Sequence, residues 1–168
     1  MRILEKVGSD TDAAVLRATF GCFPTGVAAV CAQVDGEMVG MAVSSFTSVS
    51  LTPPLVSICI DNGSSTWPKL RRAATLGVSV LSATHDLAGR QLAARTGDRF
   101  AGLNTTTTAS GAVLLEDAAA LYECSIEDEL AAGDHTIVVL RVLALAAEPT
   151  TLPLVFHGSR FHQLAAAQ

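Results

Sequence analysis

Residues 38–60 read MVGMAVSSFTSVSLTPPLVSICI, and this stretch decides the fold class. It is uncharged, carries seven hydroxyl side chains and contains the adjacent prolines Pro53 and Pro54. A membrane-spanning helix is a poor interpretation, because the prolines break a helix and the hydroxyl groups are costly in lipid. Small and β-branched residues instead alternate over 39–49, and 55–60 is a buried run. The stretch therefore predicts two strands joined by a turn at 51–54.

The middle of this stretch, Ser44–Ser50, is a neutral surface rich in hydrogen-bond donors. Such a surface can hold a phosphate and a flat polar ring without adding net charge, which is what a flavin site requires. A hydroxyl-rich strand that faces solvent is the alternative, and the pattern alone favours it.

The length and charge of the chain limit its class and its partners. The 168 residues predict one domain, 1–168, which is long enough to bury a sizeable core. Charged residues make up 16%, against about a quarter in ordinary soluble proteins, so we expect a surface covered by a partner subunit or by a ligand, with a homodimer as the leading explanation. An alanine-rich monomer is the alternative. The net charge is −5, and the largest basic cluster is Lys69, Arg71 and Arg72, which is too small for a nucleic-acid partner.

The cysteines and the N-terminus indicate a reducing cytoplasm. Cys22, Cys31, Cys59 and Cys124 form no C-x-x-C pair, so we expect buried or half-buried free thiols, with Cys22 and Cys124 in the core. The opening MRILEKVGSD lacks the apolar segment of a secretory signal. No membrane partner is expected.

The four histidines are scattered and show no zinc-ligand spacing, so no metal site is expected. His157 and His162 differ by five positions. On one continuous strand they would face opposite sides, which argues against a paired metal site.

Turn signals and apolar runs predict mostly hairpin-linked strands. Asp35-Gly36 is the strongest hairpin signal, and residues 97–112 read as a loop. Such a pattern favours a closed antiparallel barrel. No G-x-G-x-x-G or P-loop motif is present, so a bound nucleotide is not held by those cradles. The expected helices are 10–21, 65–73 and 85–95, and the expected strands are 26–34, 37–46, 55–60, 76–81, 121–126, 136–146 and 154–160.

Several blocks resemble the short-chain flavin reductase family, whose members have the FMN-binding split barrel. The resemblance covers about residues 13–164, and the closing RFHQL is similar to reductase components that serve flavin-dependent monooxygenases in polyketide tailoring. The matching blocks, in order, are FPTGV (23–27), GMAVSSF (40–46), SVSLTPPLV (48–56), DRFAG (98–102), EC (123–124), GDHT (133–136) and PLV (153–155). The chain departs from the family at 92–96, which lacks the aromatic residue many members carry, and at 62–67.

The resemblance implies a mainly β, antiparallel, Greek-key-like split barrel with a few short flanking helices, assembled as a homodimer. It implies hydride transfer from NADH or NADPH to FMN, with FAD possible, and delivery of reduced flavin to a partner monooxygenase. The two cofactors carry out this reaction themselves, so no catalytic residue is expected; the protein stacks and aligns them.

The resemblance also assigns binding roles, each with a structural alternative. The 42–45 segment would contact the polar edge of the flavin, or else only face solvent. Ser65 and Thr66 would bind phosphate at a helix start, or else only cap that helix. Arg95 would add a forked cation, with Arg99 the second choice. The expected cofactor-binding residues are Thr25, Val27, Ala42, Val43, Ser44, Ser45, Cys59, Ile60, Asp61, Ser65, Thr66, Trp67, Arg95 and Phe100, with His135 on the nicotinamide side.

For five of these residues the alternatives stay open. Thr25 and Val27 would lie along the isoalloxazine or simply begin a strand. Trp67 and Phe100 would wall the pocket or fill the core, and for both the core is favoured. For His135 the alternative is a structural role, because a histidine at the start of a strand is more often structural.

Two other functions remain as alternatives. One is a non-catalytic barrel that binds flavin or a small ligand, and the other is a flavoprotein oxidase that retains its FMN. The residues favour neither NADH nor NADPH, neither FMN nor FAD, and neither tight retention nor exchange of the flavin.

Overall fold

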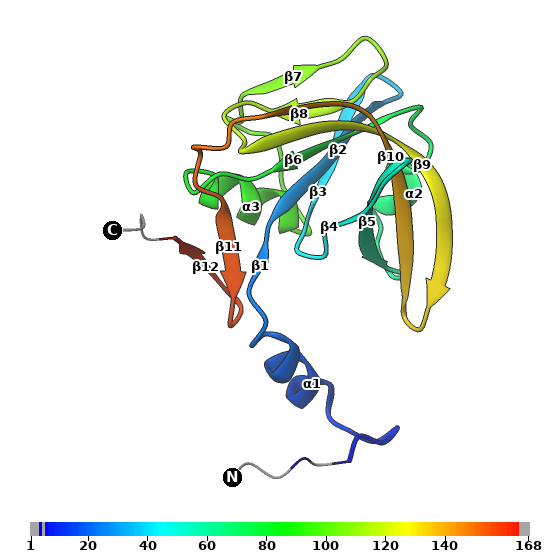
Figure 1. The fold of residues 1–168 in the computed structure, drawn as a ribbon, viewed down its shortest axis with the longest axis vertical. Coiled ribbons are helices and arrows are strands. Elements are labelled where there is room, and N and C mark those ends of the chain that lie inside the picture. The colour runs from blue at the N-terminus through cyan, green and yellow to red at the C-terminus, as the bar shows by residue number, and fades with distance from the viewer. Residues whose placement is uncertain (1–3, 5, 165–168) are drawn as a thin grey trace.

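A computed structural model describes residues 4 and 6–164, and in this part the chain forms strands with three short helices (Figure 1). The elements in chain order are α1 (Ala13–Phe20), β1 (Thr25–Gly26), β2 (Ala28–Val34), β3 (Glu37–Val43), β4 (Thr47–Leu51), β5 (Pro54–Asp61), α2 (Trp67–Leu70), β6 (Leu76–Val80), α3 (Asp86–Ala93), β7 (Thr105–Thr107), β8 (Val113–Leu115), β9 (Ala120–Ala132), β10 (His135–Ala147), β11 (Leu154–His157) and β12 (Arg160–Gln163).

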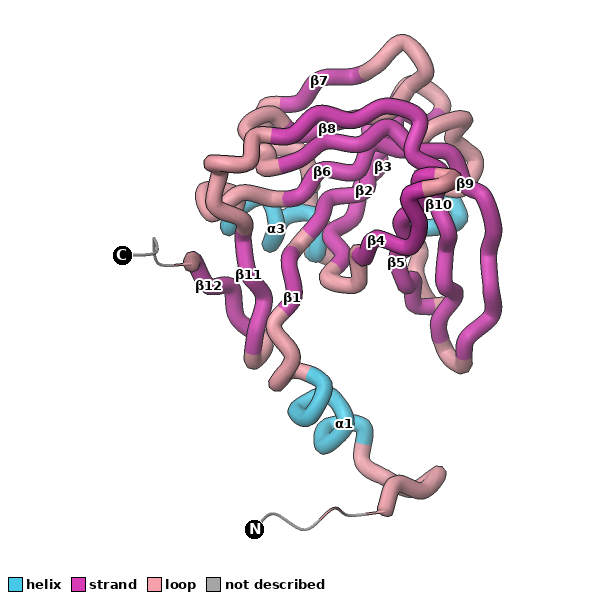
Figure 2. The backbone as a smooth tube through the Cα atoms, in the orientation of Figure 1, coloured by secondary structure: helices cyan, strands magenta, loops and turns pink. Residues whose placement is uncertain are grey.

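The main sheet is antiparallel and has the strand order β3-β2-β6-β9-β10-β5-β4. The structure also has a smaller sheet, β1-β11-β12, and the two-stranded β7-β8 sheet. The strands curve around a common interior, and the long β9–β10 hairpin extends beyond the others as an arm (Figure 2). The predicted mainly β split barrel is confirmed.

The barrel is bridged by a side chain at the place where the sheet ends meet. In the described residues no backbone ladder joins β3 to β4 or β5. Instead the Ser45 hydroxyl accepts a hydrogen bond from the Cys59 amide at 2.8 Å and donates one to the Cys59 carbonyl at 3.1 Å. The expected closed barrel is therefore open along this line.

Strand β2 separates two apolar cores because it is buried on both faces. Val30 belongs to the interior core with Ile58 and Val78. Cys31 belongs to a second core with Leu92 of α3, and its complete burial raises the pKa of its thiol to about 12. Helix α3 thus covers the outer face of β2 and β3, and this packing places the end of α3 beside β3 (Figure 1).

The turn residues explain which hairpins form. Asp35 and Gly36 both have positive φ, at 54° and 85°, so the predicted β2–β3 hairpin is confirmed. The prediction of one strand over 154–160 is wrong, because Gly158 and Ser159 also have positive φ and fold the chain back.

This turn brings His157 and His162 to the same side of the β11–β12 hairpin. Their ring centroids lie 5.9 Å apart, so the expectation that they face opposite ways is wrong.

Three further elements differ from the predictions. The expected 97–112 loop contains β7, whose partner β8 was not predicted. The hydroxyl-rich segment contributes its own strand, β4, which pairs with β5 after the turn at Thr52-Pro53. Helix α2 has only four residues, fewer than the expected 65–73.

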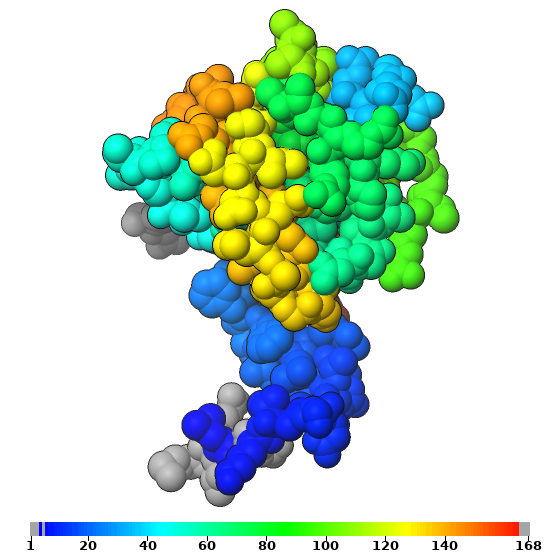
Figure 3. Space-filling view, turned by 90° about the vertical axis from the view of Figure 1, so that its right-hand side faces the viewer, coloured from blue at the N-terminus to red at the C-terminus, as the bar shows by residue number. Residues whose placement is uncertain are grey.

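Helix α1 and the two exposed cysteines lie outside the cores. Asp12 caps α1 by accepting from the Ala14 amide at 2.7 Å, but no residue of α1 is buried, and the helix projects below the barrel in Figure 3. Cys22, which follows it, is exposed, so its predicted core position is wrong; Cys59 is exposed too, whereas Cys124 is buried. No described helix is both long and apolar enough to span a bilayer.

Candidate functional site

A cleft of about 450 Å³, which we call the central cleft, lies between three parts of the chain. Strand β3 contributes Ala42, the end of β5 and the loop after it contribute Asp61 and 63–66, and the end of α3 and the residues after it contribute Ala93 and Arg95. The cleft therefore lies beside α3, a region in which the sequence predicts only Arg95 as the preferred binding residue.

The central cleft continues into an apolar recess of about 130 Å³, and the two share Ala42 and Ala93. The recess is lined by the small Gly89 of α3 and by Phe156 and Phe161 of the β11–β12 hairpin. Gly89 and Ala93 are four residues apart, so both lie on one face of α3, and their small side chains leave space above that face. A Cβ on Gly89 would lie 3.0 Å from the Phe161 ring, so a larger residue would crowd this wall.

On its other side the central cleft adjoins a second cavity of about 390 Å³, which we call the basic lobe. The two share Ser65, Thr66, Arg95 and Arg99, and the basic lobe adds Lys69. The three cavities thus form one trench, apolar at one end and cationic at the other.

Arg99 is fixed at the boundary between the central cleft and the basic lobe. Its Nη1 donates to the Gly40 carbonyl and to the Thr66 hydroxyl, both at 2.8 Å. Among the described residues, its other guanidinium nitrogens have no protein partner, so they can donate to an anion. A Cβ on Gly40 would lie 2.6 Å from Cys31 and 2.7 Å from Phe100. This glycine therefore permits close packing of those two side chains, rather than the approach of a flavin ring.

The loop that precedes α2 is held by its own hydrogen bonds. Asp61 accepts from the Gly63 amide at 2.6 Å. The Ser64 hydroxyl accepts from the amides of Thr66 and Trp67 at 3.3 and 3.2 Å. The predicted capping by the side chain of Ser65 or Thr66 is therefore wrong. The amides of Thr66 and Trp67 already donate to Ser64.

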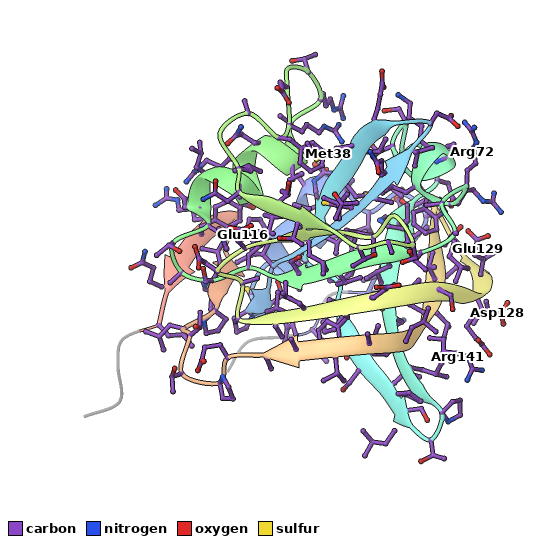
Figure 4. The ribbon with its side chains drawn as sticks, turned by 90° about the horizontal axis from the view of Figure 1, so that it is seen from above. Met38, Arg72, Glu116, Asp128, Glu129 and Arg141 are labelled. Carbon is purple, nitrogen blue, oxygen red and sulfur yellow. The ribbon has the colours of Figure 1, made fainter. Side chains whose placement is uncertain are left out.

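Hydrogen bonds and an ion pair tie this loop and α2 to the β9–β10 arm. The Thr136 hydroxyl donates to the Asn62 side chain at 2.9 Å. The Trp67 indole donates to Glu129 at 3.0 Å, and Arg71 pairs with the same carboxylate at 2.7 Å. Glu129 and Arg141 are seen on this arm in Figure 4. The arm thus fixes the loop that lines the cleft.

Cations without a carboxylate partner gather along the trench. Arg71, Arg72, Arg90 and Arg141 each form an ion pair. In the described residues no salt bridge involves Lys69, Arg95 or Arg99, which line the trench. Arg160 also has no salt bridge in the described part of the chain, and it lines a separate cavity beside Phe161. The carboxylates of Asp61, Glu37 and Asp98 also line the trench, but cations outnumber them in the central cleft and in the basic lobe. The central cleft and basic lobe are therefore suited to an anionic ligand.

The structure brings most of the expected residues to this trench. The ones that do not line it have other roles: Ile60 and Trp67 are buried, Ser45 bonds Cys59, and Thr25 lies on β1. Phe100 lines the basic lobe while also packing on the second core. The expected residues that line the trench are Val27, Ala42, Val43, Ser44, Asp61, Ser65, Thr66, Arg95 and Phe100.

His135 begins β10 and lies in register with Asp61 of the central cleft. Its Nδ1 is 2.7 Å from Asp134, and the hydrogen bond and charge of His135 lower the pKa of that carboxyl. Its role toward nicotinamide stays a prediction.

Sequence reasoning missed the contributions of Lys69, of α3 and of the β11–β12 hairpin. The signal for α3 was the spacing of Gly89 and Ala93, which gives a face of small residues. Phe161 had no comparable signal, because its place depends on the hairpin turn that was read as strand.

A flavin mononucleotide fits the residues present. It needs cations for its phosphate, donors for its ribityl and ring edges, and an apolar surface for its ring; the trench supplies these in that order. The Thr25 hydroxyl is buried without a hydrogen-bond partner in the described residues, and β1 pairs it with Phe156, which lines the recess. Such an orphaned group is expected to find a ligand.

Comparisons with known proteins agree with this geometry. A family model described as flavin reductase like domain matches residues 20–165. The chain is 40% identical over 163 residues to a flavin reductase of Pseudomonas putida, with 96% of each chain covered. It is 32% identical to a reductase subunit of a flavin-dependent monooxygenase from Rhodococcus jostii, covering 86% of this chain and 74% of that one. An NADH:FAD oxidoreductase of Streptomyces globisporus, solved with NAD and FAD fragments, superposes with a TM-score of 0.88 at 37% identity, covering 96% and 98%.

Proposed function

Since the chain belongs to the flavin reductase-like domain family, we propose that it passes hydride from NADH to a flavin and supplies the reduced flavin to a separate monooxygenase. The chain is an NAD(P)H-dependent flavin reductase, an oxidoreductase. A flavin, when bound, supplies the electron acceptor for the hydride of the reduced nicotinamide. The protein's own residues bind and align the two, and none of them acts as a nucleophile.

One observation supports the placement of the flavin above others. Cations that have no carboxylate partner in the described part of the chain border a cleft that continues into an apolar recess. We place the phosphate at Arg95 and Arg99, with the hydroxyls of Ser65 and Thr66 as further donors. The ring then lies along Ala42 and Ala93, where small side chains let it approach the backbone.

Orientation, rather than proton transfer, is the task of the surrounding residues. Arg99 holds Thr66 and β3 in a fixed relation through its two 2.8 Å hydrogen bonds. The ring centroids of Phe156 and Phe161 lie 5.6 Å apart, and the two rings exclude water from one wall of the recess. We propose that His135, which lies in register with Asp61 of the central cleft, faces the nicotinamide, where its imidazole would contact the carboxamide.

Steady-state oxidation of NADH with added FMN tests the activity. We expect turnover to depend on flavin concentration, and product flavin to exchange. A protein that binds FMN but does not oxidise NADH would instead be a binding barrel. A yellow colour that survives dialysis, together with oxidation of an organic substrate, would indicate an oxidase.

We also propose that the protein is a homodimer, that each chain forms one domain, and that it works in the cytoplasm. Exposed apolar side chains support it: Val15 and Phe20 of α1 are 54% and 70% exposed, and Leu145 of β10 is 68% exposed. Among the described strands, the second half of β10 pairs only with β9, so its other edge is open to a second copy. Light scattering tests this: a monomeric mass at micromolar concentration would contradict it.

A further inference from the structure

The basic lobe is larger than the phosphate of a mononucleotide needs. It has about 390 Å³, within the range of about 300–1,000 Å³ that is usual for small-molecule sites. It begins at Arg95 and Arg99, where the proposed function places the flavin phosphate, and it continues away from the ring. A ligand that extends beyond that phosphate would therefore enter it.

The lining of the basic lobe has three kinds of groups in one place. Lys69 carries an exposed ammonium with no carboxylate partner in the described residues. Met38, labelled in Figure 4, is 44% exposed, and the half-buried Phe100 lines the same lobe, so the two offer an apolar, polarisable lining. Glu37 and Asp98 add carboxylates.

These groups match the three parts of an adenosine phosphate. An ammonium suits a second phosphate, an apolar surface that includes Met and Phe suits a purine ring, and carboxylates suit the hydroxyls of a ribose. Asp98 accepts from the Phe100 amide through Oδ1 at 2.9 Å, and its other oxygen has no hydrogen-bond partner among the described residues, so it is available to a hydroxyl.

We propose that the basic lobe binds the adenosine monophosphate half of FAD, and that Lys69 distinguishes FAD from FMN. This assignment rests on the proposed function, because it takes the flavin phosphate to lie at Arg95 and Arg99. The same adenosine phosphate chemistry occurs in NADH, but the lobe adjoins the residues assigned to the flavin phosphate, which favours FAD.

Equilibrium titration of flavin fluorescence tests this with Lys69→Met. The Lys69 side chain makes no hydrogen bond or ion pair in the described residues, so its replacement is expected to leave the fold intact. We expect the Kd for FAD to rise about tenfold while the Kd for FMN changes less than about twofold. Lys69→Arg should restore FAD binding.

Arg72→Met is the matched control. It removes a charge three residues further on, from an exposed pair with Asp35 at 2.8 Å that lies outside the lobe. We expect both Kd values to be unchanged in this variant. Equal losses of FAD and FMN affinity, or no loss of either, in Lys69→Met would overturn the assignment.

The KM for NADH, measured with FMN as acceptor, separates the two sources of adenosine phosphate. We expect it to be unchanged in Lys69→Met. A raised KM for NADH with unchanged FAD binding would assign the lobe to the coenzyme and overturn the proposal. Absence of NADH oxidation with either flavin would contradict the proposed function instead, while the binding ratio would still report on the lobe.

Discussion

Two polar regions border the trench, and they differ in whether their groups are already used. In the 44–50 segment, Ser45 bonds both backbone groups of Cys59, and Ser50 accepts from the Thr52 amide at 3.2 Å. On the opposite side, Lys69, Arg95 and Arg99 have no carboxylate partner in the described residues. The first region is rich in hydroxyls but largely serves the backbone, whereas the second keeps its donors available. A polar composition therefore does not by itself identify the surface that binds.

The largest expected effect is on the second region. Arg99→Ala removes a guanidinium that is fixed by two hydrogen bonds and that we propose binds the flavin phosphate. Hydrogen bonds to charged groups contribute about 1.5–3 kcal/mol, so we expect the Kd for FMN to rise about tenfold to 100-fold. Fluorescence titration measures it, with Arg72→Ala as the control. An unchanged Kd in Arg99→Ala would remove the contrast between the two regions.

The next effect concerns the recess between the two regions. Ala93→Leu adds bulk on the exposed helix face that lines both the recess and the central cleft, and leucine keeps the helix. We expect about a tenfold loss of FMN affinity, because overfilling a site costs about 1–3 kcal/mol. Ala109→Leu, in the β7–β8 turn, controls for added apolar surface. Equal affinities in both variants would place the ring elsewhere.

Ser45→Ala tests the first region directly. It removes both hydrogen bonds to Cys59, so we expect unfolding free energy to fall by about 1 kcal/mol, read from urea denaturation. FMN affinity should change less than about twofold. Ser48→Ala, whose side chain makes no hydrogen bond in the described part of the chain, should change neither quantity. A tenfold loss of affinity at unchanged stability would restore the hydroxyl segment as the binding surface.

The smallest effect is a pH dependence at the start of α3, at the other end of the helix from Arg95. Burial lowers the pKa of His85 from 6.5, with the Asp117 charge opposing it, and its Nδ1 accepts from the Ser82 amide at 3.1 Å. Below pH 6.5 the unfolded state therefore binds more protons, and stability is lost as the pH falls through that value. Thermal unfolding between pH 8 and 5.5 should show a shallower decline for His85→Gln than for His162→Gln. Equal slopes would contradict this role.

The sequence predicted those features that depend on local chemistry. Asp35-Gly36 has the positive φ values of a hairpin turn, and the apolar run over 55–60 predicted a buried strand, in which Ile58 lies in the core. It also singled out Arg95 and Thr66, which do line the trench. These are short-range patterns, or residues within one recognisable block.

The features that could not be predicted depend on tertiary packing. The cavity wall formed by Ala93 and Phe161 arises only when α3 packs beside β3 and the hairpin folds back at Gly158-Ser159. Whether Ser45 serves a ligand or the backbone depends on the position of β5, fourteen residues away. Residue type indicated a donor, but not which acceptor it would meet.

The most direct test of the central claim compares riboflavin with FMN, which differ only in the phosphate. If Arg95 and Arg99 bind that phosphate, the native protein should bind FMN at least about tenfold more tightly than riboflavin, and the doubly substituted Arg95→Ala/Arg99→Ala protein should bind both about equally. Native preference for FMN that persists undiminished in the double variant would contradict the account.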